Sequence, residues 1–189
     1  MDVYLIHGKA GSPDGSSLHL EELLRPALPN AHFRRPLLPH SEPMVPAEVS
    51  LDALRDLSLP HEARIIGISL GGLLAARLQE SGRPDLHVLA LSSPTWADNV
   101  YLAQKPKHRV AIYSSTDEVL GGGDPENPSV NRTIDWPRLA DAYDLRWLSH
   151  DTKAHKQQLA PLLANWLSGA PVFGLLGLEL QEVPQEPDS

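Results

Sequence analysis

The sequence predicts a three-layer α/β fold, with a mostly parallel six-stranded sheet and helices on both of its faces. Short apolar runs alternate along the chain with segments of helical periodicity, which is typical of a parallel sheet covered by helices. The run at residues 3–6 is continuous rather than interrupted by polar residues, as expected for a strand that is buried on both faces. Most of the 18 prolines fall between these segments, which indicates many short connections.

The expected elements follow from these patterns in chain order. Strands are expected at residues 3–6, 31–38, 63–68, 86–91, 109–113 and 145–148, and helices at residues 18–28, 47–57, 70–80, 95–103, 136–142 and 156–167. Ser16 or Ser17 can cap the first helix, and Gly82 with Pro84 ends the third. Pro161 lies inside the last helix and predicts a kink or a later start there.

One domain over residues 1–168 is expected, followed by a C-terminal extension over residues 169–189. The last ten or so residues are rich in Glu and Pro, so they are expected to be disordered. An apolar stretch at residues 172–178 offers a contact for a homodimer, and folding back onto the core is the alternative.

Composition excludes several classes of function. The net charge is -8 without any Lys/Arg cluster to offset it, which argues against a nucleic-acid partner. The chain has no cysteine, so disulfides, thiolate metal sites and a cysteine nucleophile are excluded. No apolar run approaches the ~18 residues of a membrane span, and the first strand leaves no room for a secretory signal. We therefore expect a cytoplasmic protein without a metal or cofactor.

The sharpest motif is Gly67-Ile68-Ser69-Leu70-Gly71. An apolar strand leads into it and a strong helix former leads out, and this context is typical of a nucleophile elbow. The turn exposes the Ser69 hydroxyl at the C-terminal edge of the sheet. The glycines lie where strand and helix would crowd any Cβ.

A serine nucleophile requires a base and an acid at the same edge of the sheet. His155, just before the last helix, is the preferred base, and His150, directly after the last expected strand, is the alternative. Asp117 follows the fifth strand and is the preferred acid, with Glu118 and Asp124 as alternatives.

An oxyanion site needs two backbone N–H groups directed at the developing charge. Leu70 at the start of the helix supplies one, where the helix dipole also favours an anion. The loop after the first strand supplies the other, most simply Lys9, with Ala10 as the alternative. This loop contains neither nucleotide-binding glycine motif, so a phosphate cradle is disfavoured.

Together these residues resemble the α/β-hydrolase superfamily, and most of all its small cap-less serine hydrolases and esterases. The chain order Ser69, Asp117, His155 matches that fold, as do the His7-Gly8 pair and the elbow at residues 65–72. The resemblance covers roughly residues 3–167. Ala154 departs from it, because many members have Gly before the catalytic histidine.

The resemblance implies a serine hydrolase of the carboxylesterase class that cleaves a small or medium ester through an acyl-enzyme. Ser69 would attack, His155 would carry the proton, Asp117 would orient it, and Leu70 and Lys9 would hold the oxyanion. A thioesterase or amidase using the same triad, and a non-catalytic binding protein with this fold, remain as alternatives. The glycine-containing loop at residues 119–133 is a hypothetical partial cover for an otherwise open site.

Overall fold

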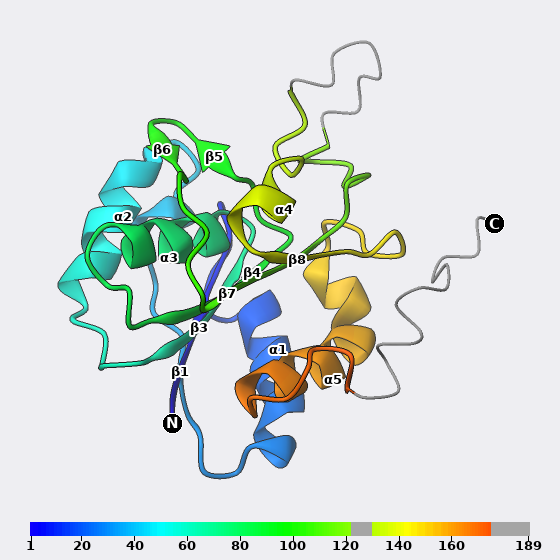
Figure 1. The fold of residues 1–189 in the computed structure, drawn as a ribbon. Coiled ribbons are helices and arrows are strands. Elements are labelled where there is room, and N and C mark those ends of the chain that lie inside the picture. Colours follow the sequence, from blue (N-terminus) through cyan, green and yellow to red (C-terminus); the bar gives the residue numbers. More distant parts are fainter. Residues whose placement is uncertain (122–129, 175–189) are drawn as a thin grey trace.

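A six-stranded parallel sheet forms the centre of the computed structural model, which describes residues 1–121 and 130–174 (Figure 1). The strand order is β2-β1-β3-β4-β7-β8, and every pair in it is parallel. The strands are β1 (Asp2–Ile6), β2 (His32–Arg34), β3 (Arg64–Ile68), β4 (His87–Leu91), β7 (Arg109–Tyr113) and β8 (Asp141–Asp144). The expected α/β fold class is confirmed.

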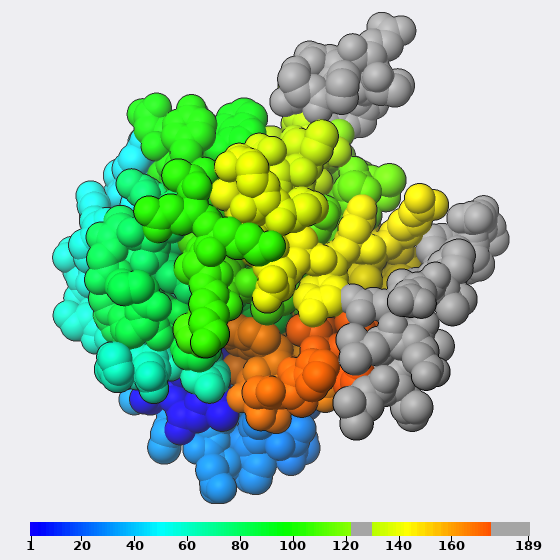
Figure 2. Space-filling view, viewed as in Figure 1, coloured from blue at the N-terminus to red at the C-terminus, as the bar shows by residue number. Residues whose placement is uncertain are grey.

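Helices cover both faces of this sheet. They are α1 (Ser16–Leu24), α2 (Ala47–Asp56), α3 (Leu70–Glu80), α4 (Trp136–Leu139) and α5 (Lys156–Leu167), with 3-10 turns at Arg25–Ala27, Pro39–Ser41 and Thr152–His155. Helices α2, α3 and α4 pack on one face, and α1 and α5 pack against each other on the opposite face. In Figure 2 the orange C-terminal helix accordingly lies against the blue N-terminal segments.

Side chains alternate between the two faces of the sheet along each strand, so the strands contribute to two separate hydrophobic cores, one on each face. In β1, Tyr4 and Ile6 join the core beneath α2 and α3, whereas Val3 and Leu5 join the core beneath α1 and α5. All four side chains are buried, which explains why the strand is apolar without interruption.

Two expected elements are wrong. Residues 95–103 form a hairpin of β5 (Trp96–Ala97) and β6 (Val100–Tyr101) rather than a helix, with Asp98 at a φ of 49° between the two strands. The last strand is Asp141–Asp144 rather than residues 145–148. Leu145 and Leu148 are apolar because they are buried in a turn against the core beneath α1 and α5.

The chain beyond α5 is described only as far as Gly174. Val172 is buried, and Phe173 stacks at an angle on Tyr143 with ring centroids 5.4 Å apart, so this part folds back onto its own core. The rest of the apolar stretch, the expected disordered end and residues 122–129 of the hypothetical cover lie outside the described residues. No helix within the described residues is long and apolar enough to cross a membrane.

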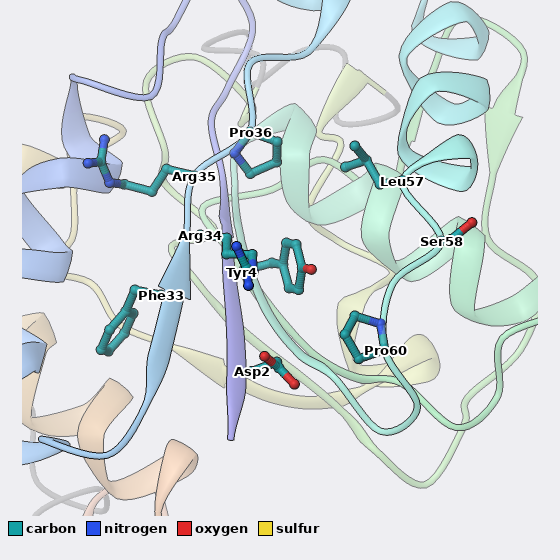
Figure 3. Close-up of a pocket in the computed structure, with 9 residues that line it drawn as sticks. All are labelled: Asp2, Tyr4, Phe33, Arg34, Arg35, Pro36, Leu57, Ser58 and Pro60. Atoms are coloured by element: carbon teal, nitrogen blue, oxygen red, sulfur yellow. The ribbon is translucent and has the colours of Figure 1, made fainter.

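A groove of about 580 Å³ lies between the β2 edge of the sheet and the loop that joins α2 to β3. Figure 3 shows the Tyr4 ring in this groove on the side of Leu57 and Pro60, while Phe33 and Arg35 point away from it. Arg35 is bound to the buried Glu21 at 3.0 Å. Ser58 lines the groove, but no histidine does, so the groove lacks a serine with an imidazole base beside it.

Candidate active site

Ser69 lies on a strained turn between β3 and α3. Its backbone has a φ of 52° and a ψ of -124°, a conformation of the kind that costs about 1–3 kcal/mol in a residue with a side chain. A Cβ on Gly67 would lie 2.4 Å from the backbone of Gly72. A Cβ on Gly71 would lie 2.6 Å from the carbonyl oxygen of Ile6. Only glycine at these positions lets strand and helix approach closely enough to expose the serine.

Ser69, His150 and Asp117 form one chain of hydrogen bonds. His150 Nε2 lies 3.1 Å from Ser69 Oγ, and His150 Nδ1 lies 2.8 Å from Asp117 Oδ2. Because an ionised carboxylate only accepts, the network assigns the imidazole proton to Nδ1 and leaves Nε2 as the acceptor for the Ser69 proton. This is the arrangement in which an imidazole activates a hydroxyl.

The Asp117 carboxylate is buried and fully engaged. Its side chain is 1% exposed, and Oδ1 accepts from the N–H groups of Val119 at 2.8 Å and Leu120 at 2.9 Å. Burial alone would raise the pKa of this carboxyl, but the hydrogen bond from His150 and the two backbone donors outweigh burial and lower the pKa. The carboxylate therefore stays charged at neutral pH and can stabilise an imidazolium at His150.

The structure corrects the expected position of the base, because His150 rather than His155 lies beside Ser69. His155 Nε2 accepts from the Ser149 N–H at 3.1 Å and lies 2.8 Å from the Ser149 hydroxyl, while its ring meets the Trp147 ring edge-on. These contacts direct His155 into its own loop. Since the last strand begins at Asp141, the loop reaches the sheet edge earlier than expected. Ala154, which departs from the family pattern, was the signal against His155.

Glu118 and Asp124 are the alternatives to Asp117 as the acid, and the structure describes only Glu118. Glu118 accepts from the backbone N–H of His150 at 2.9 Å and 3.2 Å through its two oxygens, so it holds the loop that carries the base. Asp124 lies outside the described residues.

Lys9 and Leu70 are the candidate oxyanion donors, and both line the hollow in front of Ser69. Leu70 is the first residue of α3, where a backbone N–H has no partner within the helix. The Gly8 carbonyl accepts from Gly11 N–H at 3.0 Å and lies 2.9 Å from His7 Nδ1. The Gly8 carbonyl and the Lys9 N–H belong to one trans peptide and therefore point in opposite directions. Because the carbonyl is held by Gly11 and His7, the Lys9 N–H points away from those two contacts.

The alternative donor Ala10 is already occupied, since its N–H donates to the carbonyl of His40 at 2.9 Å. Sequence analysis missed His40 because it lies in a proline-broken loop without periodicity. Its Nε2 lies 2.7 Å from the His7 carbonyl and its Nδ1 lies 2.9 Å from Ser50 Oγ, which also accepts from the His40 N–H at 2.8 Å. Both the ring and the backbone of His40 thus fasten the oxyanion loop.

Both loop histidines are held neutral. Burial lowers the pKa of His40 to about 4, and burial also lowers the pKa of His7. His7 Nε2 accepts from the Leu38 N–H at 3.0 Å, so its proton lies on Nδ1 and donates to the Gly8 carbonyl. The hydrogen bonds of the two rings are consistent with a single tautomer of each.

Two hollows meet at Ser69 and His150. The first has a volume of about 390 Å³ and an apolar wall that includes Val45, Pro94 and Leu120. The second has a volume of about 260 Å³ and lies against the loop after β1 and the start of α1. A substrate can therefore extend to both sides of the nucleophile.

Within residues 1–121 and 130–174, no group of three or more His, Asp or Glu side chains is placed to hold a metal ion.

Comparison with solved structures shows that the chain has the α/β-hydrolase fold. Alpha/beta hydrolase domain-containing protein 10 from mouse is similar with a TM-score of 0.66 and 11% identity, over 89% of this chain and 90% of that one. The ydeN gene product from B. subtilis has a TM-score of 0.63 and 19% identity, over 89% and 97%. An α/β serine hydrolase without a lid from Xanthomonas campestris has a TM-score of 0.61 and 14% identity, over 88% and 81%. No family model and no curated protein matches the sequence.

Proposed function

We propose that this protein is a serine hydrolase that cleaves a carboxylic ester through an acyl-enzyme. The observation that carries the proposal is the chain of hydrogen bonds from Ser69 through His150 to the buried Asp117. The shared fold with proteins named as hydrolases, one of them a serine hydrolase without a lid, also supports it. The identities are low, so the geometry of the site carries the argument.

In the first half of the reaction, Ser69 Oγ attacks the ester carbonyl carbon while its proton passes to His150 Nε2. The imidazolium is stabilised by Asp117, and the oxyanion accepts from the N–H groups of Leu70 and Lys9. His150 then gives the proton to the alcohol oxygen as the C–O bond breaks, which leaves the acyl group on Ser69.

In the second half, a water molecule attacks the acyl-enzyme. His150 takes a proton from this water, and the same two N–H groups hold the second oxyanion. When the bond to Ser69 Oγ breaks, His150 returns its proton to that oxygen. The acid leaves and the enzyme regains its starting state.

The segment between β4 and β7 contains only the β5–β6 hairpin over the sheet edge, so no helical lid is inserted at this point. Ala97 and Asp98 of this hairpin line the first hollow. Its volume of about 390 Å³ matches the small end of ligand pockets, which favours a small or medium ester.

The test compares hydrolysis of p-nitrophenyl esters of increasing acyl length by the wild-type protein and by three variants. Ser69→Ala should abolish both hydrolysis and labelling by a fluorophosphonate, and His150→Gln should reduce kcat by about 10³-fold or more. His155→Gln is the matched control and should retain most of the activity, because its ring contacts Ser149. Loss of activity in His155→Gln alone, with His150→Gln active, would overturn the assignment of the base. Thioesters and amides in the same panel establish which acyl derivatives the site accepts.

A further inference from the structure

The second hollow beside Ser69 has polar walls that the proposed mechanism does not use. It has a volume of about 260 Å³ and shares Lys9, Ser69 and His150 with the first hollow. Its remaining walls come from the glycine-containing loop after β1, from the first turn of α1 and from Ile68, Asp151 and Thr152.

Helix α1 begins at this hollow without a side-chain cap. Gly15 precedes the nine-residue helix and makes no side-chain hydrogen bond to it, and the N–H groups of Leu18 and His19 donate to the Gly15 carbonyl. Among the described residues, the N–H groups of Ser16 and Ser17 have no acceptor. Both residues line the hollow, so two donors and the positive end of the helix dipole lie at its wall.

A second observation is independent of the helix. Ser17 Oγ and Thr152 Oγ1 are buried side-chain oxygens without a hydrogen-bond partner among the described residues, and both residues line this hollow. Ser17 is 0% exposed and Thr152 is 2% exposed. A buried hydroxyl left unpaired costs about 1–3 kcal/mol, so two of them on the wall of one hollow indicate an acceptor that belongs there.

The charges around the hollow favour an anion. Lys9, an exposed residue of the loop after β1, is a cationic residue among those that line the hollow. The carboxylate on the wall belongs to Asp151, which is an exposed residue. The residues that line this space beside the nucleophile thus carry two N–H groups and two hydroxyls without partners among the described residues, and one positive charge.

We propose that this second hollow binds an anionic group of the substrate, a carboxylate or a phosphate. The substrate is then an ester with an apolar portion in the first hollow and an anionic portion in the second, with the scissile carbonyl at Ser69 between them. This assignment of substrate class rests on the proposed esterase function.

The kinetic test compares two pairs of esters that differ in one negative charge. p-Nitrophenyl butyrate is paired with mono-p-nitrophenyl glutarate, whose charge is on the acyl side, and phenyl acetate with 4-carboxyphenyl acetate, whose charge is on the alcohol side. The anionic ester should have the higher kcat/KM in at least one pair. In the double variant Ser17→Ala with Thr152→Val, the anionic-to-neutral ratio should fall about tenfold.

The backbone donors are tested at Ser16, the first helical position, where proline is tolerated. Ser16→Pro removes an N–H group and should lower the ratio further than Ser16→Ala, which keeps the N–H. A preference for the neutral ester in both pairs, or a ratio that the variants leave unchanged, would overturn the anion site.

A binding measurement separates this proposal from the proposed activity. Inorganic phosphate and acetate are titrated into the Ser69→Ala protein, and the backbone amide resonances of Ser16 and Ser17 are followed by NMR. Saturable shifts that the Ser17→Ala with Thr152→Val double variant weakens support the anion site even if no ester is hydrolysed. Absence of shifts with both anions overturns the site, whatever the esterase assay shows.

Discussion

Replacing His40 by phenylalanine should reduce catalysis although His40 does not touch the substrate hollow. The ring makes two hydrogen bonds, one to the His7 carbonyl at 2.7 Å and one to Ser50 Oγ at 2.9 Å. Phenylalanine fills the same space and makes neither. At about 1 kcal/mol for each bond, the free energy of unfolding should fall by about 2 kcal/mol, which lowers Tm by roughly 4–8 °C in a chain of this size.

The catalytic effect follows from the peptide that His40 holds. The His7 carbonyl belongs to the peptide that precedes the Gly8–Lys9 peptide. When it loses its donor, the loop that carries the Lys9 N–H is held less rigidly, although the contacts of the Gly8 carbonyl remain. Loss of one oxyanion donor typically costs about 10²–10³ in kcat, and a misdirected donor should cost less, about 10- to 100-fold. KM should change little, because the donor acts on charge that exists only in the transition state.

The assay is steady-state hydrolysis of a p-nitrophenyl ester beside a thermal melt of each protein. His40→Gln is the matched variant, because its amide N–H can still donate to the His7 carbonyl, and it should recover most of kcat. If His40→Phe lowers Tm by the expected amount but has the kcat of the wild type, His40 stabilises the fold without orienting the loop, and the reasoning is refuted.

Three further outcomes are expected. Asp117→Asn should lower kcat by about 10³–10⁴-fold with a smaller effect on KM, because the amide no longer holds the His150 proton on Nδ1. Gly72→Ala should lower the free energy of unfolding by about 1–3 kcal/mol, measured by urea unfolding, because the new Cβ would lie 2.0 Å from Ser93 Oγ and 2.8 Å from the carbonyl oxygen of Gly67. Stability should fall by about 3 kcal/mol as pH drops from 6.5 to 4, because burial lowers the pKa of His40 to about 4 and the unfolded chain takes up the proton first.

Each of these has a contrary result. Asp117→Asn with an unchanged kcat would show that the carboxylate does not orient the base. A Gly72→Ala protein as stable as the wild type would show that strand β3 and helix α3 can move apart at residue 72 without loss of folding free energy. A pH dependence between 6.5 and 4 that persists undiminished in His40→Gln would assign it to groups other than His40.

The sequence predicted the central strands and the elbow because their residues are buried on both faces. β3 and β4 are continuous apolar runs, and the glycines around Ser69 are required by contacts that any Cβ would break. Local pattern and tertiary packing agree at these positions, so the sequence pattern is sufficient to predict the strands and the turn.

The errors fall where local pattern and packing disagree. β8 is an edge strand with exposed Asp141 and Asp144 at its ends, whereas the apolar residues that follow it are buried in a turn. Misplacing this strand also misplaced the loop that carries the base, and His155 was preferred over His150. The role of His40 depends on contacts with residues 10 and 33 positions away, which no local pattern contains.

The pairing of α1 with α5 has a consequence for how the chain is made. One face of the sheet is covered by α1 and α5, the first and last helices of the described residues, so Leu20 and Leu24 lack their partners Leu159 and Leu163 until α5 has been synthesised. During translation α1 has only β1 and its neighbours to pack against, and this core stays open to water and to chaperones. We expect stable folding only after α5 has left the ribosome, although every residue of the proposed triad is translated before it.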